Sequence, residues 1–157
     1  MLSGKGSSAK ASGIYYGYRG QHFDFTTNVY HLVPNTSCNI LVKGVLDGET
    51  SSVYRGKIKI NKEAQITDSY QADHVLLLGD AVSNSIPSLE IDANDVKASH
   101  GVTMGKPDED EIFYLMARGL DNSTAEKLII NGFFSDAIDR ISSEDIKIRF
   151  EEVLNKG

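Results

Sequence analysis

The sequence predicts a mainly β fold over residues 1–105 and a small helical domain over residues 106–157. Three observations carry this prediction. Apolar and polar residues alternate in the first part, an apolar pair recurs there at a fixed spacing, and helix-capping patterns follow Pro107. The 157 residues suffice for one domain with a small appendage.

The strands are indicated by period-two alternation, which places one face inward and one outward. Alternation runs through residues 38–43 and 57–61, and residues 75–78 are apolar throughout, as in a strand buried on both faces. Turn signals at Asp47-Gly48 and Gly79-Asp80 separate these runs.

An apolar pair recurs in steps of 18 residues, from 40 to 58 to 76. A fixed spacing of this kind suits a solenoid in which each coil stacks on the last. Three repeats do not exclude a β-sandwich, which stays open on the pattern alone. The pairs are Ile40 and Val42, Ile58 and Ile60, and Leu76 and Leu78.

Three short helices are expected after Pro107. Acidic residues 108–111 suit a first helical turn, and Gly119 suits a helix end. Residues 123–126 match a capping box, and a third helix is expected to begin near Ser142. Its apolar side comprises Ile146, Phe150, Val153 and Leu154.

Charge and composition restrict the class of function. With 16 Lys+Arg against 22 Asp+Glu, the net charge of −6 argues against a nucleic-acid or anionic-membrane partner. The single Cys38 excludes an internal disulfide and indicates a reducing compartment. No apolar run reaches the ~20 residues of a membrane span, and the first ten residues lack the apolar stretch of a signal peptide. We therefore expect a cytoplasmic protein.

Several stretches, taken in order, make the sequence resemble the C-terminal region of the SufB/SufD family of iron–sulfur cluster assembly proteins. They cover nearly the whole chain, and their specificity lies in the ordered set. The stretches are GQHFD at 20–24, YRGKI at 54–58, DSYQ at 68–71 leading into LLLGD at 76–80, LEI at 89–91, DVKASHGVT at 95–103, FYL at 113–115, RGL at 118–120, and residues 125–133.

The resemblance implies a right-handed parallel β-helix, partial here, followed by a helical domain. It implies a non-catalytic scaffold that works with a SufC-type ABC ATPase and with a SufB-type or SufD-type subunit. There is no Walker-type phosphate-binding motif, so ATP use would belong to the partner. No cofactor is expected to bind tightly to this chain alone, although iron or an iron–sulfur cluster is expected at the subunit interface.

Two positions favour the SufD type. SufB-type chains carry a Cys just before the Leu-Gly-Asp stretch and a Glu after the late His, whereas this chain has Asp73 and Gly101 there. A SufB-like, cluster-carrying scaffold remains the alternative. His100 resembles the late-strand His that SufD-type proteins place at the interface, and imidazole is a good ligand for iron. Metal or cluster handling is therefore assigned to His100. Asp73 is assigned to the same role as an oxygen ligand, with a solvated acid at the strand edge as its other interpretation.

Two interfaces follow from the resemblance. The helical domain is the expected docking site for the ATPase, through Phe113, Arg118, Phe133 and Phe134. Adjacent aromatics point about 100° apart on a helix, so one ring of the 133–134 pair is expected inside and the other free. A homodimer is expected through the last strands, with Leu89, Ile91, Val96 and His100 at the interface.

A second class of function would be a β-helical carbohydrate-active enzyme. It would need a pair of carboxylates flanking a groove, and the sequence does not set their separation. The acidic residues in question are Asp68, Asp73, Glu90 and Asp92.

Overall fold

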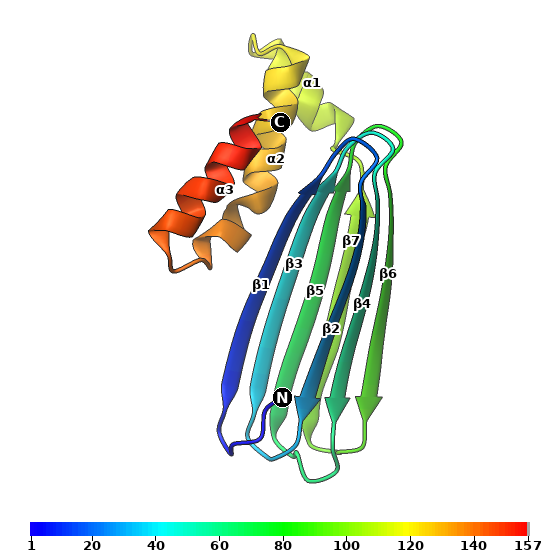
Figure 1. Ribbon diagram of the computed structural model, residues 1–157, viewed down its shortest axis with the longest axis vertical. Helices are drawn as coiled ribbons and strands as arrows, with labels where there is room; N and C mark the ends of the chain where they lie inside the picture. Colours follow the sequence, from blue (N-terminus) through cyan, green and yellow to red (C-terminus); the bar gives the residue numbers. More distant parts are fainter. Residues whose placement is uncertain (157) are drawn as a thin grey trace.

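Two parallel β-sheets face each other in the computed structural model, and three helices follow them (Figure 1). The structure describes residues 1–156, apart from the side chains of residues 153, 155 and 156. The first sheet has the order β1 (Ser8–Gly17), β3 (Ser37–Leu46), β5 (Thr67–Leu77) and β7 (Val96–Gly105). The second sheet has the order β2 (His22–His31), β4 (Ser51–Ile60) and β6 (Val82–Ile91).

The chain passes alternately from one sheet to the other, so that one coil contains a strand of each sheet. Strands in register lie 29 or 31 residues apart, as in Ser8↔Ser37 and Ser37↔Asp68. All strand pairings are parallel, which confirms a solenoid of about three turns and excludes an antiparallel sandwich.

The 18-residue spacing is not the coil repeat, and that interpretation is wrong. The three apolar pairs lie on β3, on β4 and at the end of β5, which are consecutive strands in opposite sheets. A coil consists of two strands and two turns, so a strand-to-strand spacing measures only part of it. The first two pairs face the interior cluster, whereas Leu76 and Leu78 pack in the outer one, so the even spacing does not mark equivalent positions.

The space between the sheets is filled by one apolar cluster. Its largest fully buried members include Tyr54, Leu46, Ile58 and Ile60. A second cluster lies outside the first sheet, where Val45 and Leu76 pack against Phe134. Because Val75 faces the interior cluster and Leu76 the outer one, the expectation of a strand buried on both faces is confirmed at β5.

The helices are α1 (Glu109–Ala117), α2 (Asn122–Asp139) and α3 (Glu144–Lys156). Asp108 caps α1, since its carboxylate accepts a hydrogen bond from the Asp110 N–H at 2.9 Å. Asp121, not Ser123, caps α2, so the predicted capping box begins two residues too late. Gly119 adopts a φ of +97° after α1, as expected for a helix end. Among the expected apolar residues of α3, the side chain of Val153 lies outside the described part of the structure.

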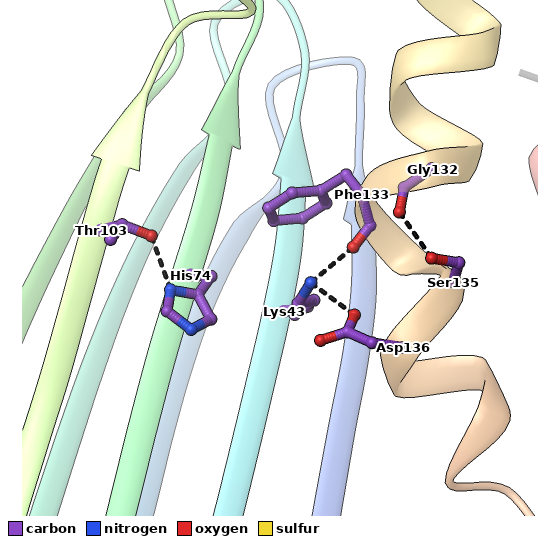
Figure 2. Close-up of polar contacts among 7 residues, drawn as sticks. All are labelled: Lys43, His74, Thr103, Gly132, Phe133, Ser135 and Asp136. Atoms are coloured by element: carbon purple, nitrogen blue, oxygen red, sulfur yellow. Dashed lines mark hydrogen bonds and ion pairs between the residues drawn. The ribbon is translucent and has the colours of Figure 1, made fainter.

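Lys43 fixes α2 to the outer face of the first sheet (Figure 2). Its ammonium group donates to the Phe133 carbonyl at 2.6 Å, pairs with the Asp136 carboxylate at 2.5 Å, and lies 4.7 Å from the centre of the Phe133 ring. The next residues in the same row across the sheet are His74 and Thr103, which hydrogen-bond to each other at 2.6 Å. A single buried cation therefore joins the helical domain to the β-helix.

No helix in residues 1–156 combines the length and the apolar character required to cross a membrane.

Candidate functional site at the open end of the β-helix

The β-helix ends on two free strand edges. Within the described residues, β6 pairs only with β4, and β7 pairs only with β5. Apolar side chains are exposed there, including Ile91 at 41% and Val102 at 38%. Unpaired edges with exposed apolar residues are the usual template for adding another strand. The end at β6 and β7 is therefore the candidate surface for a partner.

His100 lies on the inner face of this end. Gln71 of β5 points into the interior, because a Cβ on Gly56 of the opposite sheet would lie 1.5 Å from its Nε2. His100 is the register partner of Gln71 in the parallel strand β7, so both side chains lie on the same face. Unlike Gln71, which is 3% exposed, His100 is open to solvent.

Asp73 shares that inner face, two residues beyond Gln71 on β5. The structure thus places the two residues assigned to metal handling on the same inner face, His100 on the edge strand β7 and Asp73 on β5, where its register partner is Val102. Asp73 is only 1% exposed, and neither carboxylate oxygen has a regular hydrogen-bond partner. An exposed strand-edge acid, the other interpretation of Asp73, is therefore excluded.

Burial raises the pKa of the Asp73 carboxyl group above its ordinary value, and the nearby Ser85 hydroxyl opposes the rise only in part. Burial also raises the pKa of Tyr15 to about 12, with the negative charge of Asp73 contributing. Gln71 Oε1 is likewise buried without a partner. The interior below His100 thus holds an excess of hydrogen-bond acceptors, which a bound cation or a donor group would satisfy.

The chain by itself supplies few metal ligands at this end. Residues 1–156, as far as their side chains are described, contain no group of three or more His, Cys, Asp or Glu able to hold a metal ion. Gln71 was missed from sequence, although a polar residue on the inward phase of a strand is a usable signal. One imidazole, one carboxylate and one amide oxygen on the same face are fewer ligands than a closed metal site has.

The residues assigned to a dimer interface all lie on the two edge strands. Leu89 and Val96 are half-buried and pack against the interior cluster, whereas Ile91 and His100 are exposed. Burying the two exposed side chains requires a partner.

The residues assigned to ATPase docking do not form one surface. Phe113 is 72% exposed on α1, and Arg118 stacks 4.8 Å from the Tyr114 ring centre beside it. Phe133 is half-buried beneath Lys43. Phe134 is 0% exposed, so its assignment as a partner contact is wrong. It packs between Val45, Leu76 and Phe150, because the sheet covers the α2 face on which it lies.

The accessible apolar surface on the helices lies elsewhere than expected. α1 has no buried residue, and with α2 it exposes Phe113, Tyr114, Met116 and Leu128. Tyr114 and Met116 were not among the residues assigned to docking from the sequence.

The acids considered for carbohydrate cleavage do not converge. Asp73 faces the interior, whereas Glu90 accepts a hydrogen bond from Lys57 on the outer face of the second sheet.

Cys38 is buried, and burial raises the pKa of its thiol, which suits a packing residue.

The chain is thus a parallel β-helix with free strand edges at β6 and β7, followed by a helical domain. Residues 1–133 match the domain family described as "SUF system FeS cluster assembly, SufBD core domain". The chain belongs to the SufBD family.

Similar proteins support the same family. A SufBD family iron–sulfur cluster assembly protein of Mycobacterium leprae is 33% identical over 94% of this chain and 40% of its own length. The corresponding protein of Mycobacterium tuberculosis strain H37Rv is 33% identical over 96% of this chain and 40% of its own length. The SufD protein of Bacillus subtilis is 31% identical over 99% of this chain and 36% of its own length. The chain thus spans about two fifths of these relatives.

Proposed function

We propose that the chain is part of a SufD-like scaffold subunit that assembles iron–sulfur clusters without catalysing a reaction itself. The observation that supports this most is the shared inner face of His100 and Asp73 at the open end of the β-helix. Asp73 in place of a cysteine suits a supporting subunit better than a cluster-carrying one. A relative of the chain in Bacillus subtilis is named SufD.

The partner at the open end is a SufB-type subunit, or in isolation a second copy of this chain. Exposed Ile91 and Val102 supply the apolar contact, and the free edges of β6 and β7 supply backbone donors and acceptors. Iron or a nascent cluster is the cargo, bound where His100 meets ligands of the partner. The cell compartment is the cytoplasm, where a lone thiol stays reduced.

The second partner is a SufC-type ATPase that docks on α1 and α2. α1 combines exposed Phe113 and Tyr114 with acidic residues 108–111. An exposed aromatic pair offers the anchors that dominate such contacts, and the acids favour a basic partner surface.

The test is cluster assembly in the reconstituted complex, comparing His100→Ala with His22→Ala. His22 is a matched control, because it is also an exposed strand histidine, bonded to Ser51 at 2.8 Å. We expect His100→Ala to lower cluster formation while both variants keep the circular dichroism of the parent. Equal activity of the two variants would refute the role of His100.

An iron titration of the purified chain separates the two family roles. A SufD-like chain should bind iron weakly by itself, since its site is incomplete. Stoichiometric, stable cluster binding by the chain alone would instead support a SufB-like scaffold.

A further inference from the structure

A groove of about 620 Å³ lies between β1, β3 and the turn that joins α2 to α3. Its lining comprises two basic residues, four neutral polar residues and two isoleucines, with no Asp or Glu. Four other hollows on the described surface each include at least one acidic residue. In a chain of net charge −6, a groove with only positive charge is a deviation that calls for an explanation.

Asn39 lies between the two basic residues that line this groove. Lys10 of β1 is its register partner in the neighbouring strand, so their side chains project side by side from the outer face of the first sheet. On the other side, the Arg140 guanidinium donates from Nη1 to Asn39 Oδ1 at 2.8 Å. Two residues 130 positions apart are thereby brought to the same polar side chain.

No carboxylate neutralises this pair of charges. Among the side chains described, no ion pair includes Lys10 or Arg140. Asp136 is close enough to feel the charge of Arg140, but its carboxylate is bonded to Lys43. The acids at the start of α3, residues 144 and 145, do not line the groove. Like charges held together without a counter-charge favour an anionic ligand.

The remaining lining specifies the kind of anion. The guanidinium keeps four N–H donors after its bond to Asn39, in the planar arrangement that suits phosphate oxygens. Ser142 and Ser143 add hydroxyl donors from the turn. Ile141 and Ile146 provide an apolar wall, with Ile146 55% exposed.

We propose that this groove binds a small organic phosphate, with the phosphate group between Lys10 and Arg140 and the organic group against Ile141 and Ile146. The volume is in the range of small-molecule sites. Such a ligand contacts both β-strands and the α2–α3 turn, so its binding strengthens the attachment of the helical domain to the β-helix.

The test measures binding of phenyl phosphate, inorganic phosphate and phenol to the whole chain at constant ionic strength, by calorimetry and amide chemical shifts. We expect phenyl phosphate to bind at least about five times more tightly than inorganic phosphate, because burying apolar area adds affinity. Lys10→Gln should weaken phenyl phosphate binding about tenfold, in line with the loss of one charge-assisted hydrogen bond. Among the side chains that the structure describes, Lys10 forms no ion pair whose loss would disturb the fold.

Lys5→Gln is the control, because Lys5 is an exposed lysine outside the groove. Arg140→Lys provides a second variant that keeps the charge but loses the planar donors, and it should weaken binding as well. Equal affinity of the parent, Lys10→Gln and Arg140→Lys would overturn the proposal. Equal affinity for phenyl phosphate and inorganic phosphate would overturn the proposal that an organic group binds in the groove. Phenol binding as tightly as phenyl phosphate would overturn the proposal that the groove binds a phosphate group.

Discussion

The contact between Lys43 and Asp136 predicts an unusual order of mutant stabilities. The Lys43 side chain is 11% exposed and that of Asp136 is 57% exposed. Asp136→Ala removes the partner of a nearly buried ammonium group and leaves it with the Phe133 carbonyl and ring. Removing a hydrogen bond to a charged group costs about 1.5–3 kcal/mol, and the exposure of Asp136 favours the lower end.

Lys43→Met should cost less than Asp136→Ala. Methionine keeps an unbranched stem against the Phe133 ring, and its sulfur tolerates an aromatic neighbour. The variant leaves no buried charge, and Asp136 returns to water. Replacing an ion pair by an apolar group of similar size is often neutral, so we expect a change within about 1 kcal/mol.

The assay is urea unfolding followed by circular dichroism, arranged as a double-mutant cycle. In the Lys43→Met background, Asp136→Ala should change the free energy of unfolding by less than about 0.5 kcal/mol, because no buried ammonium group is left to lose its partner. Glu90→Ala is the control, since its pair with Lys57 is 42% and 37% exposed and such pairs contribute about 0–1 kcal/mol. If Asp136→Ala cost the same with and without Lys43, the contact would not hold α2 on the sheet.

Three further predictions address pH, docking and assembly. Burial lowers the pKa of His31, so the unfolded chain takes up a proton at this residue more readily than the folded chain. The free energy of unfolding should therefore fall as the pH drops below the ordinary His pKa of 6.5. Urea unfolding at pH 7 and at pH 5 should show a smaller loss of this free energy in His31→Gln than in the parent. Phe113→Ala should weaken binding to the cognate ATPase by about 2 kcal/mol in a titration without lowering stability. Phe134→Ala should instead cost about 3–5 kcal/mol of stability. Unchanged binding by Phe113→Ala would exclude the α1 surface as the docking site. Light scattering should show a dimer that Ile91→Lys weakens, while a monomeric parent at micromolar concentration would refute pairing through β6 and β7.

Local periodicity was enough to predict the strands, but it misplaced the coil repeat, and the β-helix itself was predicted from the family resemblance. The alternation in β3 and β4 and the apolar run in β5 identified strands correctly, because each strand buries at least one face. The coil length depends on which strands pair, and pairing is a contact between distant residues. The α2 cap was misplaced for a local reason, because Asp121 and Ser123 are both acceptable capping residues.

The sequence by itself determined the β-helical and helical parts, the acidic balance, the single thiol and the family resemblance. Only the tertiary structure decided that Asp73 is buried on the same inner face as His100 and that Lys10 and Arg140 line the same groove. It also decided that Phe134 is covered while Phe113 is free. The physical reason is that residue type and local period depend only on residues close together in the sequence. Burial and the proximity of distant charged residues depend instead on strand register and on how α2 packs against the first sheet.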